Sequence, residues 1–260
     1  MANAKDIIVK PITAQAANAV VKRIHYSGKV VQNSQLHFGV FLGDKLEGAM
    51  SFGPSMDKRK MLGLVKNTGW NGFLELNRMA FSDLLPRNSE SRAMAVAFKL
   101  IRKHYPHIEW IVSFSDGTQC GDGAIYRAAG FSLCGIKENK QILEWNGQRI
   151  AKKSLDNENY PKPNGKYFSR HLLETGQAKP LQGFQLRYIY FMNQAARERL
   201  TVPVLPFSKI SDMGASMYKG EKITRVKKQD SENPSELGGA VPTDTLQTSQ
   251  KLEPFAEVKE

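Results

Sequence analysis

The stretch SFSDGTQCGDGAIYRAAGF, residues 113–131, constrains the fold of this chain more than any other part of the sequence. It continues the apolar segment IEWIV, and together they predict a buried central strand that ends at Asp116. A loop with three glycines follows and leads into a short helix closed by Gly130-Phe131. Core packing alone does not require this order. A carboxylate at the carboxyl end of a central strand instead predicts a binding floor at that edge of a sheet.

The other periodic segments predict a mixed α/β (α+β) fold in which helices flank one sheet. Apolar residues recur at helical spacing at Ala93, Ala97 and Ile101, so the helix that carries them is expected to pack on that sheet. The expected elements, in chain order, are a strand near 6–12, a helix from the Thr13 cap to Ser27 with Gly28 beyond it, a hairpin turning at Gly43-Asp44, a strand over 73–81, a helix over 90–105, the strand ending at Asp116, and a final hairpin over 131–150.

Several features that the sequence lacks narrow the class of protein. There is no G-x-G-x-x-G motif and no Walker loop, which disfavours dinucleotide and nucleoside-triphosphate enzymes. The N-terminal segment MANAKDIIVKPI has no long apolar run, so we expect neither a signal peptide nor a membrane span, and a cytoplasmic protein. Cys120 and Cys134 lack metal-ligand spacing and are expected to be reduced thiols.

Positive charge is concentrated in the first 228 residues. The net charge is +12, and seven acidic residues against two lysines from Gln229 onward leave +17 on residues 1–228. A surplus of this size favours a polyanionic partner such as nucleic acid, although the same charge could serve solubility alone. We expect three parts: a catalytic core over 1–150, a basic and aromatic extension over 151–227 packed on that core, and a disordered acidic tail over 228–260.

The order of elements resembles the GNAT acyltransferase fold, most specifically at AIYRAAGF, residues 124–131. In such enzymes the central strand parts from its neighbour, the arm of an acyl-CoA fills the gap, and a tyrosine on the next helix protonates the departing thiolate. The resemblance implies that role for Tyr126, with Gly130 left-handed and Phe131 returning to the core. A plain helix cap followed by a buried aromatic would give the same short pattern.

The loop before the long helix departs from this fold's usual pattern. It reads PRNSESR and lacks the spaced glycines of a pyrophosphate loop. Backbone amides at a helix N-terminus could still hold phosphates, aided by two arginines. The resemblance therefore implies an acyl-CoA-type donor, acetyl-CoA in the simplest case, held by Arg87, Asn88, Ser89, Ser91 and Arg92.

Four ordered stretches together resemble the Mom family of bacteriophage DNA-modification proteins: HYSGK at 25–29, ELNRM at 75–79, PRNSESR at 86–92, and FSD at 114–116 leading to Tyr126. The resemblance covers roughly residues 7–220, including MYKG at 217–220. It implies an enzyme that adds a carbamoylmethyl group to the exocyclic amino group of adenine in double-stranded DNA, which blocks host restriction enzymes. It also implies an acyl-CoA-type donor and Fe(II). Because the adenine amino group is a poor nucleophile in a stacked base, proton removal and base flipping are chemically sensible.

The implied catalytic residues each have a structural alternative. His25, at the end of the first helix, could complement the helix dipole, and Tyr26 could pack. Asp116 could cap a turn, and Tyr126 could be a core residue. Arg78 would need an ion pair, with Glu75 or Asp83, if it were buried. A histidine, a carboxylate and a phenolate suit non-haem iron, so His25, Asp116 and Tyr126 are the expected metal ligands.

Two groups of basic residues are expected to contact DNA. The first lies in a loop between strands, and aromatics that could stack on bases accompany the second; the residues are Lys58, Arg59, Lys60 and Lys66, then Lys166, Arg170 and Lys219. One other function stays open, a generic N-acyltransferase acting on a protein or small-molecule amine. A DNA-binding module without catalysis is disfavoured, because it would not need an aspartate at the strand end followed by Tyr126. The sequence leaves the oligomeric state undetermined.

Overall fold

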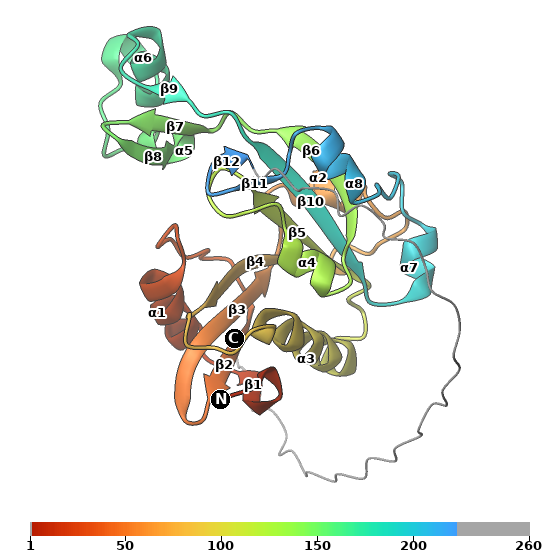
Figure 1. Cartoon of the computed structure of the whole chain (residues 1–260). Coiled ribbons are helices and arrows are strands. Elements are labelled where there is room, and N and C mark those ends of the chain that lie inside the picture. The colour runs from red at the N-terminus through yellow and green to blue at the C-terminus, as the bar shows by residue number, and fades with distance from the viewer. Residues whose placement is uncertain (1, 223–260) are drawn as a thin grey trace, which may run out of the picture. The chain divides into compact units, whose positions relative to one another are not determined.

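The computed structural model describes residues 2–222, so the acidic tail expected over 228–260 lies outside the described residues. The main feature is a seven-stranded sheet in the order β1-β2-β3-β4-β5-β10-β6 (Figure 1). Neighbouring strands are antiparallel except β4 and β5, which are parallel. The strands are β1 Ile7–Pro11, β2 Leu36–Leu42, β3 Lys45–Gly53, β4 Phe73–Phe81, β5 Trp110–Asp116, β6 Ser132–Glu138 and β10 Phe184–Phe191. The expected mixed α/β sheet is confirmed.

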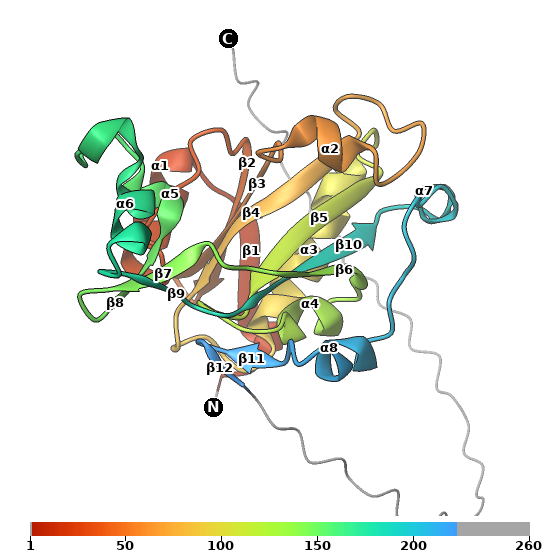
Figure 2. The ribbon, with the colours of Figure 1, turned by 90° about the horizontal axis from the view of Figure 1, so that it is seen from above.

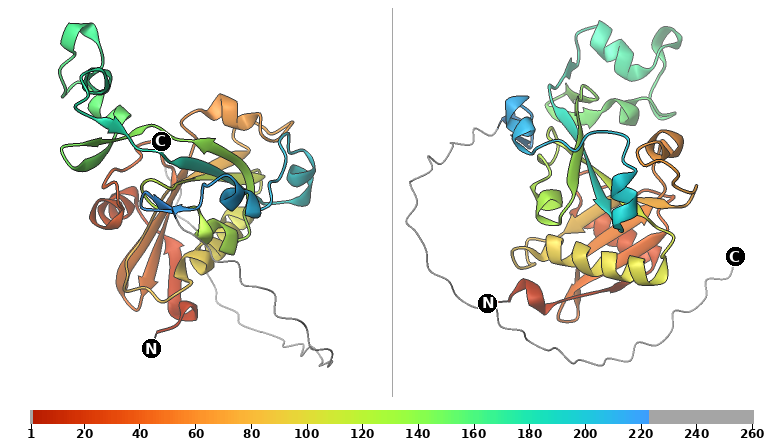
Figure 3. Two further views of the ribbon diagram at one scale, coloured as in Figure 1. Left: turned by 45° about the horizontal axis from the view of Figure 1, so that its top comes forward. Right: turned by 90° about the vertical axis from the view of Figure 1, so that its right-hand side faces the viewer.

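Helices cover both faces of this sheet (Figure 3). On one face, α3 (Ser89–His104) buries the expected stripe at Ala93, Ala97 and Ile101, and α4 (Ala124–Ala128) lies beside it. On the opposite face, α1 (Ala14–Ile24) packs its buried alanine and valines against Ala49 and Ala80. The short α2 (Lys58–Leu62) belongs to a second apolar cluster around Trp110. No helix among residues 2–222 is long and apolar enough to cross a membrane.

Local signals in the sequence are confirmed at several turns. Thr13 caps α1 by accepting a hydrogen bond from the amide of Ala16. Gly43 has a φ of +57° in the β2–β3 hairpin, and Gly130 has a φ of +83° at the end of α4. Phe131 is 2% exposed and packs in the main core. One boundary was wrong, because α1 ends at Ile24 and the following residues form a turn rather than a further helical turn.

The predicted final hairpin over 131–150 was also wrong. Strand β6 pairs with β10, whose sequence FQLRYIYF stands 45 residues further along the chain. The hairpin forms instead between β7 (Ile142–Trp145) and β8 (Gln148–Ala151), because Asn146 and Gly147 both adopt the positive φ that a two-residue hairpin turn needs. The main sheet therefore includes a strand, β10, from the segment after residue 150, in addition to the strands from the core expected over 1–150.

Residues 139–183 form an insert between β6 and β10, seen at the upper left of Figure 1. In it β7 pairs with β8 and with β9 (Lys179–Pro180), and α5 (Lys152–Leu155) and α6 (Phe168–Glu174) pack on this small sheet. The insert has an apolar cluster of its own, formed by Leu143, Leu155, Leu172 and Ala178. The insert thus has a small core of its own beside the main core.

The two parallel strands at the centre of the sheet pair only over their first residues. Pairing covers Phe73 with Trp110, Leu74 with Ile111 and Glu75 with Val112, although β4 continues to Phe81 and β5 to Asp116. Figure 2 shows the strands side by side at their starts and apart toward their ends. The register of β4 against β3 also shifts, so that Phe52 faces Leu76 but Ser51 faces Arg78, leaving Asn77 as a bulge.

After β10 the chain runs through α7 (Gln194–Glu198) and α8 (Ser208–Asp212) to a ribbon of β11 (Met217–Tyr218) and β12 (Glu221–Lys222). This ribbon covers the glycine-rich loop after β5. The amide of Lys219 donates to the carbonyl of Cys120, and the amide of Gly220 donates to that of Gly117. The MYKG segment therefore holds the loop that follows Asp116.

The glycine before α4 gives a test of how tightly this loop is packed. Gly123 has a φ of +81°, and a Cβ there would lie 2.4 Å from the ring of the fully buried Tyr188. Gly147 has a similar φ of +72° but open space around it. We expect Gly147→Ala to destabilise the fold by about 1 kcal/mol, and Gly123→Ala by a further ~1–3 kcal/mol from overpacking. Urea unfolding measures both, and equal losses would contradict this packing.

Candidate active site

The gap between β4 and β5 opens a cavity of about 360 Å³. All five residues expected to be catalytic line it: His25, Tyr26, Arg78, Asp116 and Tyr126. The remaining lining residues are Glu75, Leu76, Asn77, Met79, Phe114, Cys120, Ile125 and Gln185. Residues more than 100 positions apart in sequence thus meet where the two parallel strands separate.

Residues from both faces of the sheet line the cavity. On β5, Trp110 and Val112 pack with the α2 cluster, whereas Ile111 packs with α3. Successive side chains of the strand therefore point to opposite faces of the sheet. The same alternation places Glu75 on the α1–α2 face, together with His25 and Tyr26 that follow α1. Tyr126, on α4, lies on the opposite face. The site therefore offers one set of groups on each side of the sheet.

His25 is a half-buried neutral ring. Burial, with a smaller effect from the Arg78 charge, lowers the pKa of His25 to about 4. The backbone N–H of Ser27 donates to Nδ1 at 3.2 Å, and the Ser27 hydroxyl lies 2.8 Å from the same atom. Because Nδ1 accepts, the proton of the neutral ring is on Nε2. His25, which lines the cavity, can therefore donate a hydrogen bond from Nε2. The alternative in which a charged imidazolium complements the dipole of the preceding helix is disfavoured.

Tyr126 presents a buried phenol to the α4 side of the cavity. Burial raises the pKa of Tyr126 to about 12, although a hydrogen bond with Ser113 acts in the opposite direction. Its ring lies 5.3 Å from those of Phe131 and Tyr188. A fixed and protonated phenol is suited to giving a proton to a leaving group.

Sequence reasoning missed Glu75, which lies at the last paired position before the strands part. Burial raises the pKa of Glu75, offset in part by hydrogen bonds with Ser55 and Asn77 and by the charge of Arg78. A desolvated carboxylate with a raised pKa is a stronger base than an exposed one. The sequence does contain a sign of such a residue, because a charged side chain interrupts the apolar strand FLELNRMAF. From the sequence alone, however, Glu75 is expected only as an ion-pair partner of Arg78.

Arg78 makes neither of the ion pairs considered from the sequence. Its Nε donates to the carbonyl of Lys29 and its Nη1 to that of Asn77, both at 2.7 Å. These bonds fix the guanidinium between β4 and the loop after α1. Tyr26 lies in that loop with its ring 4.2 Å from that of His25, and 57% of its surface is exposed.

Asp116 combines a cavity position with a structural bond network. Its Oδ1 accepts from the amide of Thr118 at 2.9 Å and from the Thr118 hydroxyl, and its Oδ2 accepts from Asn139 Nδ2 at 2.8 Å. Asn139 is the first residue of the insert. Asp116 therefore ties the glycine-rich loop to the base of the insert, as the alternative of a turn cap had allowed.

The three expected iron ligands all line the cavity, but two of them already make other contacts. Both carboxylate oxygens of Asp116 accept hydrogen bonds, and Nδ1 of His25 accepts one from Ser27. Within residues 2–222, no group of three or more His, Cys, Asp and Glu side chains is arranged to hold a metal ion. An iron centre at His25, Asp116 and Tyr126 stays a prediction.

The residues expected to bind the donor surround the N-terminus of α3. Asn88 has a φ of +70°, and its side chain does not cap the helix, while Arg87 and Arg92 are exposed. Ser89 is buried and donates to the carbonyl of Pro86, and Ser91 donates to that of Asn88. Since α3 follows the end of β4, this terminus lies at the same edge of the sheet as Asp116. Arg87, Arg92 and the backbone amides are the groups there that can meet phosphate.

The structure distributes the basic residues over four places. Lys58, Arg59 and Lys60 stand on α2, which the sequence had suggested as a loop. Lys66 is exposed before β4, and Lys219 lies in the C-terminal ribbon. Lys166 and Arg170, on the insert, both pair with Glu174 at 2.7 and 2.9 Å. Their charge is therefore partly balanced within the insert.

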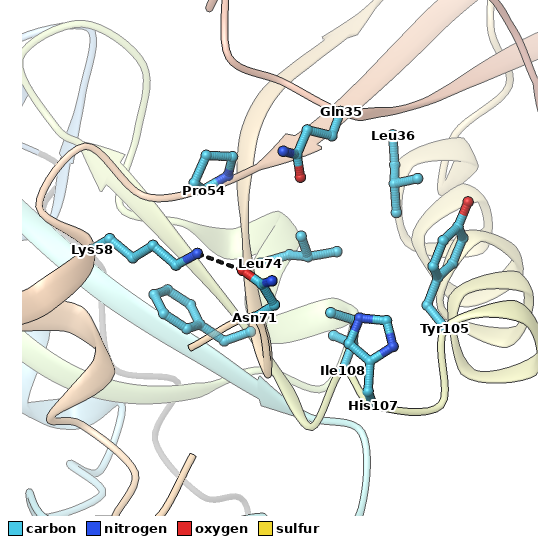
Figure 4. Close-up of a pocket in the computed structure, with 10 residues that line it drawn as sticks. Gln35, Leu36, Pro54, Lys58, Asn71, Leu74, Tyr105, His107 and Ile108 are labelled. Carbon is cyan, nitrogen blue, oxygen red and sulfur yellow. Dashed lines mark hydrogen bonds between the residues drawn. The ribbon is translucent and has the colours of Figure 1, made fainter. Parts of the chain in front are cut away.

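A second cavity, of about 290 Å³, lies at the starts of β4 and β5 (Figure 4). There Lys58 Nζ donates to Asn71 Oδ1 at 2.9 Å, the bond drawn dashed, and lies 4.6 Å from the centroid of the Trp70 ring. Lys58 is thus engaged within the protein, whereas Arg59 and Lys60 are exposed. None of the expected catalytic residues lines this cavity.

The state of His25 gives a pH test of the site. We expect the ring to remain neutral, as the Nε2–H tautomer, down to about pH 4, which nitrogen chemical shifts measure by NMR. The unfolded chain binds this proton near pH 6.5. Folding stability should therefore fall as pH drops from about 6.5 toward 4, and His25→Asn should remove this part of the loss. An imidazolium at pH 6, or an Nδ1–H tautomer, would contradict the assignment.

Comparison with known proteins identifies relatives of this chain and its family. It is 35% identical over 210 residues to the "Methylcarbamoylase mom" of Escherichia phage Mu, which covers 79% of this chain and 85% of that protein. Among solved structures it is similar to Arabidopsis thaliana NAA60 in complex with a bisubstrate analogue (10% identity, 72% and 99% of the two chains, TM-score 0.43). It is also similar to FeeM, an N-acyl amino acid synthase from uncultured soil microbes (15%, 75% and 95%, 0.42). The model of the Mom protein family matches residues 6–209. The chain belongs to the Mom protein family.

Proposed function

We propose that this enzyme modifies DNA by transferring a group to the exocyclic amino group of adenine in a duplex. The observation that carries the proposal is the cavity at the parting of β4 and β5, which has a basic carboxylate, Glu75, on one face and a protonated phenol, Tyr126, on the other. The relative in phage Mu is named a methylcarbamoylase, which supports transfer chemistry of this kind. We place the protein in the cytoplasm of the phage's host, where the modification would protect phage DNA from restriction.

The donor is proposed to enter from the α3–α4 face. An acyl-CoA-type molecule would place its phosphates at Arg87, Arg92 and the amides of the α3 N-terminus, including that of Ser91. Its thioester arm would pass into the gap, where β4 and β5 leave their facing edges without strand pairing after Glu75 and Val112. Backbone amides and carbonyls on those edges can bond the arm as another strand would.

The adenine is proposed to enter from the α1–α2 face, where Glu75 removes a proton from its amino group. That nitrogen is a weak nucleophile because its lone pair is delocalised, and general base catalysis typically contributes 10²–10⁴-fold. The Nε2–H of His25 would donate to an acceptor on the base or on the transferred group. Tyr126 would return a proton to the departing thiolate on the opposite face, as the phenol of a buried tyrosine can at neutral pH.

The product is proposed to be N6-carbamoylmethyladenine. In that product the new bond joins the adenine nitrogen to a methylene carbon that bears an amide. Displacement of the thiolate from an acyl-CoA gives an N6-acyladenine instead, so the steps assigned to Glu75 and Tyr126 account for acyl transfer only. The carbamoylmethyl product would require a nitrogen donor and a two-electron oxidant in addition to the acyl-CoA. The mass of the modified nucleoside separates the two outcomes. DNA is proposed to be held by the exposed Arg59, Lys60 and Lys66, and by Lys166, Arg170 and Lys219, with Lys58 contributing less because it bonds to Asn71.

The test is to express the chain in bacteria with a plasmid, digest the plasmid and measure deoxyadenosine by mass spectrometry. We expect a heavier deoxyadenosine with the wild type, reduced about 100-fold or more by Glu75→Gln, which keeps the shape of the side chain. Tyr126→Phe should slow transfer by about 10–100-fold. Circular dichroism serves as the control that each variant is folded. Unmodified deoxyadenosine with soluble wild type would overturn the proposal and favour an N-acyltransferase for other amines.

A further inference from the structure

Met56 is the most exposed of the large apolar side chains among residues 2–222, at 83%. It stands directly after Ser55, which is buried and hydrogen-bonds to Glu75. Gly53, three residues before it, pairs with Glu75 across β3 and β4. Through Ser55 and Gly53, Met56 is therefore close in the chain to two residues that contact Glu75.

Three segments contact one another on this face, and we call them the rim: residues 25–29, two of which line the cavity, residues 55–60 and residues 152–155. The carbonyl of Lys29 accepts a hydrogen bond from Arg78, which lines the cavity. The Nζ of Lys29 donates to Ser154 on α5 of the insert. Lys153, also on α5, places its Nζ 3.3 Å from the sulfur of Met56. The insert therefore contacts both the loop after α1 and the segment that leads into α2.

The rim is strongly basic. It carries Lys29, Lys58, Arg59, Lys60, Lys152 and Lys153, against Asp57, whose side chain accepts from the amide of Lys60 as the α2 cap. Two exposed apolar side chains, Tyr26 and Met56, stand among these charges. Cations around an apolar projection fit the phosphates of a duplex and the apolar faces of its stacked bases.

The depth of Glu75 sets a geometric requirement on any duplex substrate. Glu75 lies at the fork within the sheet, so an adenine amino group can reach it only when the base has left the stack. Extrusion leaves a gap whose neighbouring bases are unstacked, at a cost of a few kcal/mol. Flexible apolar side chains fill such gaps, and methionine adapts its shape readily.

We propose that Met56 is a wedge that enters the duplex beside the target adenine and fills the space that the extruded base leaves. This inference rests on the proposed function and extends it to the way in which the substrate is opened. Met56 suits the role better than Tyr26, whose ring stacks against His25 and lines the cavity that receives the base. The wedge acts on unstacking, and the rim lysines hold the duplex.

The experiment compares Met56→Ala with the conservative Met56→Leu and with Met213→Ala, a matched exposed methionine (41%) at the end of α8. Three quantities are measured: the rate of deoxyadenosine modification in native plasmid DNA, the affinity for duplex DNA by fluorescence anisotropy, and the permanganate reactivity of thymines in bound duplex without donor. Permanganate oxidises thymines that are unstacked, so it reports on those opposite an extruded adenine without requiring catalysis.

We expect Met56→Ala to reduce duplex modification at least tenfold, which corresponds to about 1.4 kcal/mol. It should abolish the thymine reactivity that the wild type induces and change duplex affinity less than about threefold, because the phosphate contacts remain. Met56→Leu and Met213→Ala should stay within about threefold of wild type in all three measurements.

Two results would count against the wedge. If Met56→Ala modifies duplex DNA and exposes thymines as the wild type does, Met56 does not open the duplex, while the proposed function stands. If Met56→Ala lowers affinity as much as rate, Met56 is a contact residue only. If instead the wild type neither modifies DNA nor raises thymine reactivity, the proposed function itself fails and the wedge with it.

Discussion

The separation of β4 from β5 after Glu75 and Val112 is the constraint on which the rest of the structure depends. Each strand remains paired on its outer side, β4 with β3 and β5 along its whole length with β10, so the gap is held open by the sheet itself. The bulge at Asn77 turns Arg78 toward the loop after α1, where the Lys29 carbonyl receives it. Two carbonyls along the gap accept side-chain hydrogen bonds instead of strand bonds, that of Leu76 from Ser113 and that of Asn77 from Arg78.

The same separation assigns the chemistry to two faces. Glu75 and His25 lie on the face of α1 and α2, and Tyr126 lies on the face of α3 and α4. Burial raises the pKa of both Glu75 and Tyr126 and lowers that of His25, so the site holds a strengthened base, a protonated phenol and a neutral donor. A proton can thus be taken up on one side of the sheet and given out on the other.

Features set by local chemistry could be predicted from the sequence, and features set by distant pairing could not. Thr13, Gly43 and Gly130 stand in turns whose residue preferences are local, and the stripe of α3 follows from helical spacing. Strand β10 was missed because its partner β6 is separated from it by the insert. Glu75 was missed because a glutamate in a strand can face solvent, and only the register places it at the fork. His25 lines the cavity with the other residues expected from the sequence, but its tautomer depends on a backbone amide two residues away.

The most direct test of this account is the pH dependence of kcat/KM for DNA modification. The acid limb reports the base that must be ionised in the free enzyme. Because burial raises the pKa of Glu75, the wild-type limb should lie above the range of an ordinary glutamate, and activity should fall as pH drops through it. The limb should persist in Asp116→Asn, even if the rate is reduced, and disappear in Glu75→Gln. A limb that survives in Glu75→Gln unchanged would show that another group is the base.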